Sequence, residues 1–102
     1  MIANLSDRRF LIHSEPVNLR KNFDGLLRLV ETSGNSVDFF NGHAFVFINR
    51  RHNMFKCLYW ENGTLAIWNK RLTQGTFAGK TSFSGFVTFS DLLFFVHGFN
   101  LP

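Results

Sequence analysis

The order of apolar and polar residues predicts one long amphipathic helix in the first third of the chain. In the stretch NLRKNFDGLLRLVETSG, residues 18–34, apolar side chains recur at the spacing of one helix face. These residues are Leu19, Phe23, Leu26, Leu27 and Val30. We expect Asn18 to cap the start of this helix and Gly34 to end it.

Three segments in the middle of the chain, residues 43–49, 54–60 and 64–71, have the aromatic and β-branched residues typical of strands. A shorter strand is predicted at residues 9–15, ahead of Pro16, because proline has no amide hydrogen for a ladder. Asn62 and Gly63 predict a type I′ hairpin turn, which requires positive φ at both positions. Further short strands are predicted at 75–79 and 81–90, and SDLLFFVHG predicts a C-terminal helix capped by Ser90.

This order of elements predicts an α+β fold with a mainly antiparallel sheet: a strand, a helix, then a meander of strands. One longer amphipathic helix and a short C-terminal helix complete it. With 102 residues, the chain is expected to form a single domain over residues 1–102. No apolar run approaches the roughly 20 residues of a membrane span, so no membrane partner is expected.

Residues that carry catalytic or metal chemistry are sparse. Cys57 is the only cysteine, which excludes an internal disulfide and favours a reducing compartment, the cytoplasm. A nucleotidyl-transfer site needs several acidic side chains to hold metal ions. Only Asp24, Asp38 and Asp91 are candidates, and two of these have structural roles on the predicted helices. We therefore predict a protein that is not an enzyme and that holds no metal and no cofactor.

The positive charge is concentrated in the second half of the chain. The net charge is +4. Between residues 39 and 90 the only acidic residue is Glu61, and the basic residues there are Arg50, Arg51, Lys56, Lys70, Arg71 and Lys80. Such an asymmetry points to a polyanionic partner.

The hairpin turn predicts where these cations lie. If Asn62-Gly63 forms a two-residue loop, Glu61 faces Thr64 and Phe55 faces Lys70. One end of the sheet then gathers five cations, Arg50, Arg51, Lys56, Lys70 and Arg71. Two more, Arg20 and Lys21, lie in the predicted first helical turn and extend this patch. The cations form either a solvated rim or an anion-binding patch, for which a phosphate backbone is the commonest partner.

Two segments of the chain resemble the TnpB accessory proteins of bacterial insertion sequences of the sixty-six type. NLRKNFDGL, residues 18–26, resembles the family signature MRKGFDGL. GHAFVFINRRHNMFKCLYWENGTLAIWNKRLTQGTF, residues 42–77, resembles the second signature in order and spacing. The closing FSDLLFFVHGFNL resembles the family's leucine-rich final helix. Where the family commonly has Trp-Pro, this chain has Ala78-Gly79.

The resemblance implies a small protein encoded beside a larger transposase, which assists transposition. DNA binding is the usual conjecture for the family. Together with the charge pattern, this predicts DNA binding through Arg50, Arg51, Lys56, Lys70 and Arg71, extended by Arg20 and Lys21. The alternative is an interaction module that docks on the transposase without binding DNA, through exposed aromatic residues near the hairpin or through the final helix.

Overall fold

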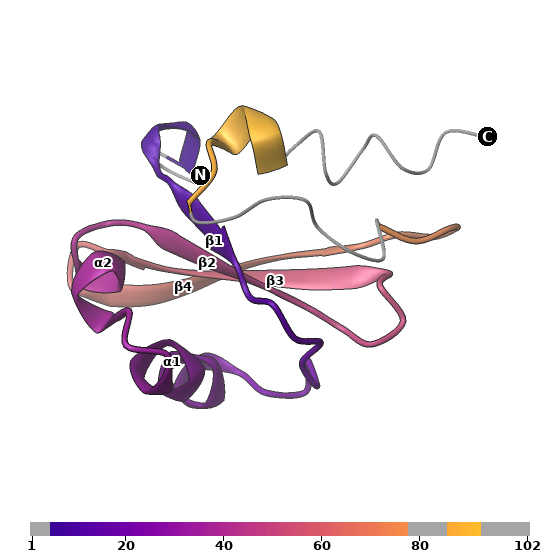
Figure 1. Ribbon diagram of the computed structural model, residues 1–102, viewed down its shortest axis with the longest axis horizontal. Helices are drawn as coiled ribbons and strands as arrows, with labels where there is room; N and C mark the ends of the chain where they lie inside the picture. Colours follow the sequence, from indigo (N-terminus) through magenta and orange to yellow (C-terminus); the bar gives the residue numbers. More distant parts are fainter. Residues whose placement is uncertain (1–4, 78–85, 93–102) are drawn as a thin grey trace.

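The computed structural model describes residues 5–77 and 86–92, and its centre is a four-stranded sheet between two layers (Figure 1). The strands β1 (Phe10–Ile12), β2 (Ala44–Ile48), β3 (Met54–Glu61) and β4 (Thr64–Arg71) lie in that order across the sheet. Helices α1 (Phe23–Thr32) and α2 (Ser36–Phe40) cover one face. The 3-10 helix η1 (Leu5–Asp7) and a helical turn at 89–92 lie on the other. The predicted α+β fold is confirmed.

The sheet is antiparallel except at β1. This strand runs parallel to β2, while β2 with β3 and β3 with β4 pair antiparallel. On its other side β1 meets a single bridge, in which Phe10 and Val87 exchange two backbone hydrogen bonds of 2.8 and 2.7 Å. A short strand was predicted at 75–79, but the described part of it, residues 75–77, is not a strand. Residues 78–85 lie outside the described residues.

The β3–β4 hairpin has the predicted turn and the predicted register. Asn62 and Gly63 have φ of 50° and 79°, and Glu61 lies opposite Thr64. Because side chains alternate between the faces of a strand, this register divides the apolar residues into two cores. Leu58 packs under α1 and α2, whereas Cys57 packs on the opposite face.

Helix α1 begins later than predicted. Its N-cap is Asn22 and its first residue is Phe23, so the prediction that Asn18 caps the helix is wrong. The Asn18 side chain instead accepts the Arg20 amide at 2.9 Å and closes a separate tight turn. Leu26 is buried in the helix-side core as expected, but the Phe23 side chain is 40% exposed.

The end of α1 is as predicted. Gly34 has φ of +81°, a left-handed conformation that favours glycine. Its amide bonds the Glu31 carbonyl at 3.1 Å, and the Asn35 amide bonds the Val30 carbonyl at 3.2 Å. These two bonds form a Schellman motif, which satisfies carbonyls that the helix would leave unpaired.

Two further helical features differ from the sequence expectations. Helix α2 was not expected, because five residues are too few to produce a helical period. The helical turn at 89–92 is capped by Thr88 rather than Ser90. The Asp91 amide bonds Thr88 Oγ1 at 3.2 Å, and the Thr88 amide bonds Asp91 Oδ2 at 3.1 Å. This reciprocal pair is a capping box, and residues 93–98 of the predicted helix lie outside the described residues.

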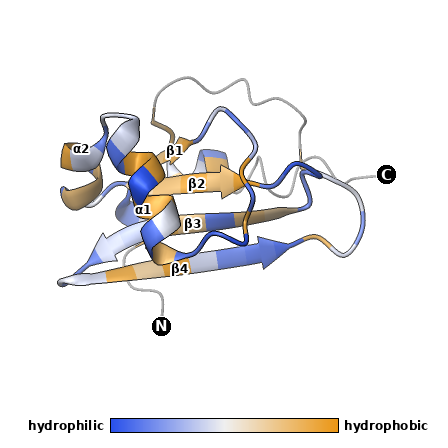
Figure 2. Ribbon diagram, turned by 90° about the horizontal axis from the view of Figure 1, so that it is seen from below, coloured by the Kyte–Doolittle hydropathy of each residue, from blue (hydrophilic) through white to orange (hydrophobic). Residues whose placement is uncertain are grey.

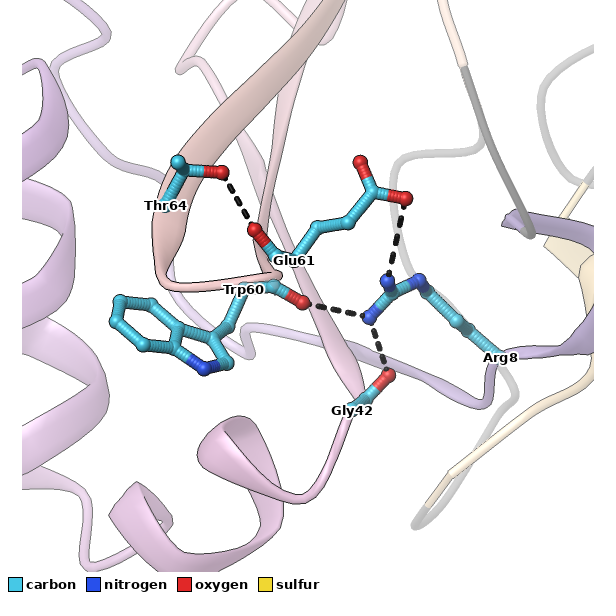
Figure 3. A network of polar contacts seen from close by, with 5 residues as sticks. All are labelled: Arg8, Gly42, Trp60, Glu61 and Thr64. Carbon is cyan, nitrogen blue, oxygen red and sulfur yellow. Dashed lines mark hydrogen bonds and ion pairs between the residues drawn. The ribbon is translucent and has the colours of Figure 1, made fainter.

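A largely buried arginine, Arg8, connects the segment before β1 to the end of β3 beside the Asn62-Gly63 turn (Figure 3). Arg8 Nη1 donates to the Gly42 carbonyl at 2.7 Å and to the Trp60 carbonyl at 3.0 Å. Arg8 Nη2 lies 3.9 Å from Glu61 Oε2, and the Arg8 side chain is only 11% exposed. Arg8 is therefore a structural residue, and its charge is largely withdrawn from solvent.

Replacing Arg8 should destabilise the fold. We expect Arg8→Met to lower the free energy of unfolding by about 2–4 kcal/mol, because two carbonyls and a carboxylate lose their donor. Arg9→Met removes the same charge from an exposed neighbour and should change it little. Urea unfolding measures both. Equal effects of the two substitutions would contradict a structural role for Arg8.

The single thiol should be inert in the folded protein. Cys57 is fully buried, and burial raises the pKa of its thiol, so the reactive thiolate is scarce at neutral pH. We expect Ellman's reagent to modify Cys57 only as the protein unfolds, and promptly in concentrated urea. Modification of the native protein at the rate of free cysteine would show that this core opens readily.

Candidate nucleic-acid interface

The predicted basic residues lie around a groove at the end of the sheet away from the Asn62-Gly63 turn. The groove has a volume of about 540 Å³ and is lined by residues 16–20, residues 49–51, Met54 and Arg71. We call it the basic groove. Its charged lining residues are all arginines, namely Arg20, Arg50, Arg51 and Arg71. Among the described residues that line it there is no aspartate or glutamate.

The first wall of the basic groove is the segment between β1 and α1. The Val17 amide donates to the Ile48 carbonyl at 2.8 Å, and the side chains of Val17 and Leu19 are buried in the helix-side core. The residues between and after them, Asn18 and Arg20, are exposed. Arg20 and Lys21 thus precede the helix instead of lying in its first turn as predicted. They are therefore outside the first helical turn, where the helix dipole most disfavours a positive charge.

The second wall is the turn between β2 and β3, which Asn49 holds through its side chain. Asn49 Oδ1 accepts the amides of Asn53 at 3.0 Å and Met54 at 3.1 Å. Asn49 Nδ2 donates to Asn53 Oδ1 at 2.7 Å. These bonds close the turn around its two positively charged residues, Arg50 and Arg51. Both arginines therefore lie on a hydrogen-bonded turn that fixes where their side chains begin.

The same turn is also joined to the chain that follows β4. The Leu72 amide donates to the Asn53 carbonyl at 2.7 Å, and the Phe77 amide donates to the His52 carbonyl at 2.6 Å. Phe77 is itself buried in the core opposite the helices. His52 has φ of 58°, a left-handed conformation that these bonds maintain. The turn is thus held both by the Asn49 side chain and by backbone hydrogen bonds from the segment that follows β4.

Two lysines lie beside the basic groove. Lys56 is two residues beyond Met54 on the same face of β3, and its Nζ donates to the Lys21 carbonyl at 3.1 Å. A Cβ at Gly25 would lie 3.1 Å from Lys21 Cβ, so the absence of a side chain there lets Lys21 run close to α1. Lys56 thus makes one intramolecular hydrogen bond, and its positive charge remains next to the arginines.

Lys70 is the predicted site residue that the register separates from the groove. It lies opposite Phe55, on the face away from α1 and α2, and its Nζ is 6.0 Å from the centre of the Trp68 ring. Arg71, the next residue, lies opposite Met54 and lines the groove. The five cations Arg50, Arg51, Lys56, Lys70 and Arg71 lie toward the end of the sheet where they were predicted, but they are not all on one face of it.

The groove has the groups to bind an anion. Arginine guanidinium groups donate paired hydrogen bonds to phosphate oxygens. Elsewhere, within the described residues, no three His, Cys, Asp or Glu side chains are close enough to hold a metal ion. No described helix has both the length and the apolar content to cross a bilayer.

Comparison with known proteins identifies the family. The family model described as IS66 Orf2 like protein matches residues 8–101. The chain belongs to this family. A protein of Sinorhizobium fredii described as uncharacterized protein y4jC is 31% identical over 77 residues, which are 76% of this chain. The chain spans 65% of that protein's length. No solved structure matches this chain.

The family assignment confirms the resemblance seen in the sequence. The family consists of accessory proteins of insertion sequences and is not a known catalytic family. For this chain, the family description points to an accessory protein of an insertion sequence.

Asn49 was missed as a residue of the site, although Asn at both ends of the NRRHN turn was a signal for side-chain to backbone bonding. We expect Asn49→Ala to lower the free energy of unfolding by about 1–3 kcal/mol, because two backbone amides and the Asn53 side chain lose their partner. Asn18→Ala breaks one bond in an exposed turn and should cost less. Chemical denaturation compares them, and a larger loss in Asn18→Ala would refute the assignment.

Proposed function

We propose that this protein assists transposition by holding the phosphate backbone of DNA in the basic groove. The observation that carries the proposal is the convergence of four arginines from three segments on one groove whose described lining has no acid. Cations without counter-charges create a positive potential that attracts a polyanion. In a protein that an insertion sequence encodes, DNA is the polyanion at hand.

Preorganised arginines support this function over a solvated rim. Arg50 and Arg51 begin on a turn held by Asn49, and Arg20 on a turn held by Asn18. Fixing these positions before binding reduces the entropy that binding must overcome. Lys70 lies on the other face, over Trp68, and does not line the groove, so it fits a solvated cation better.

The composition of the groove favours contacts with backbone over contacts with bases. No aromatic residue is among its described lining, so it offers no ring on which an unpaired base could stack. Arginine–phosphate contacts position a protein on DNA without reading sequence. Any preference for the ends of an element must then come from another surface or another protein.

A salt titration of duplex binding tests the proposal. With up to about four phosphates contacted, the slope of log K against log salt should approach about −3.6. The Arg50→Ala/Arg51→Ala double variant should lose two phosphate contacts, which lowers the magnitude of this slope by about 1.8, and should bind about tenfold more weakly or worse. Fluorescence anisotropy with a labelled duplex measures both quantities.

Two adjacent residues provide a matched control. Arg71→Ala and Lys70→Ala each remove one positive charge, at neighbouring positions of β4 that face opposite sides of the sheet. We expect Arg71→Ala to weaken binding and Lys70→Ala to leave it almost unchanged. Equal losses would mean that net charge, and not the groove, attracts DNA. No binding by the folded protein at physiological salt would instead favour docking on the transposase.

A further inference from the structure

Apolar side chains are exposed at the end of the sheet opposite the basic groove. On α2, Val37 is 74% exposed and Phe40 is 44% exposed, and their spacing of three residues places them on one side of the helix. The Phe40 ring meets the Trp60 ring edge to face, with centres 5.0 Å apart. We call Val37, Phe40 and Trp60 the α2 patch.

A hollow of about 360 Å³ adjoins this patch. Its lining includes Phe40, Trp60, Asn41, Asn62, Asp7 and Glu61. Arg8 fixes its base, since the guanidinium bonds the carbonyls of Gly42 and Trp60 (Figure 3). The indole of Trp60 points away from that guanidinium, so the ring remains free to contact Phe40. The hollow is therefore formed before any partner arrives.

The charge around the hollow is acidic, in a chain whose net charge is +4. Asp7 is exposed, and the Glu61 side chain keeps 24% of its surface exposed. Arg8 also lines the hollow, but it is only 11% exposed and pairs with Glu61 at 3.9 Å, so among the described lining residues Asp7 is the carboxylate without an ion pair. Carboxylates beside an aromatic pair repel phosphates, so this surface does not suit DNA. They attract lysine and arginine.

We infer that the α2 patch is a docking surface for a protein segment that presents an apolar side chain next to a lysine or arginine. The exposed Phe40 ring and the half-buried Trp60 ring beside this hollow are the kind of aromatic anchor on which such contacts centre. A second copy in a two-fold pair is a poorer occupant. In such a pair the patch meets itself and sets the carboxylates of Asp7 and Glu61 against their own equivalents.

The patch and the basic groove are far enough apart to be occupied together. Trp60 and Met54 stand at opposite ends of β3, six residues and about 20 Å apart. Figure 2 likewise places α2 and the hydrophilic end of β4 at opposite ends of the molecule. A protein with these two surfaces links a polyanion at one end to a polypeptide at the other. The inference stands independently of DNA binding, which a separate titration measures.

Selection from a display library of random short peptides tests the inference. We expect the selected peptides to share an aromatic or aliphatic residue flanked by lysine or arginine. The strongest, made synthetically, should bind the Val37→Ser/Phe40→Ser variant at least about tenfold more weakly than the original protein. Asp7→Lys keeps the apolar surface and should weaken binding several-fold. Circular dichroism verifies that each variant is folded.

Phe23→Ser is the matched control, because Phe23 is 40% exposed but lies at the start of α1, outside the patch. It should bind the peptide as the original protein does, and Phe40→Ser should bind DNA as the original protein does. Failure to select related peptides, a shared sequence without a basic residue, or equal loss in Phe23→Ser would overturn the inference. Self-association that Phe40→Ser abolishes would also overturn it, by assigning the patch to a second copy.

Discussion

The placement of nearly every important side chain depends on the two-residue turn at Asn62-Gly63. Both residues have positive φ, and this turn sets Glu61 opposite Thr64. A slip of one residue would turn every side chain of one strand to the other face. If β4 slipped, Ile67 would leave the helix-side core and Arg71 would leave the basic groove. One local backbone preference therefore determines both the packing of the sheet and the charge of each of its faces.

Much of the fold was predictable because its signals are local. The three long strands and their hairpin register follow from alternation and from one turn dipeptide. The start of α1 was not predictable in this way. Leu19 fits the helical period, but it is buried with Val17 in the helix-side core from the non-helical segment that precedes α1, and the helix begins only at Phe23. Tertiary burial overrides the helical period there, and α2 is too short to show one.

The candidate site was predictable as a set of charges but not as a surface. Sequence counting treats cations alike, whereas the structure gives them different roles. Arg8 bonds buried carbonyls, Lys56 bonds the Lys21 carbonyl, and Lys70 lies across the sheet from the groove. The uncharged Asn49, which carries the turn of Arg50 and Arg51, has no place in a charge count. Its role appears only when backbone amides are matched with their acceptors.

The cations at the end of β4 also affect whether two copies of the protein can associate edge to edge through their sheets. The outer side of β1 is occupied by Val87, whereas β4, within the part of the chain that the structure describes, pairs only with β3. An unpaired strand edge is a template for aggregation, and charged residues on it oppose strand-to-strand association. Asn69, Lys70 and Arg71 are all exposed on the last part of that edge. Lys70, which does not line the groove, is one of the charged residues that oppose such association at this end of β4.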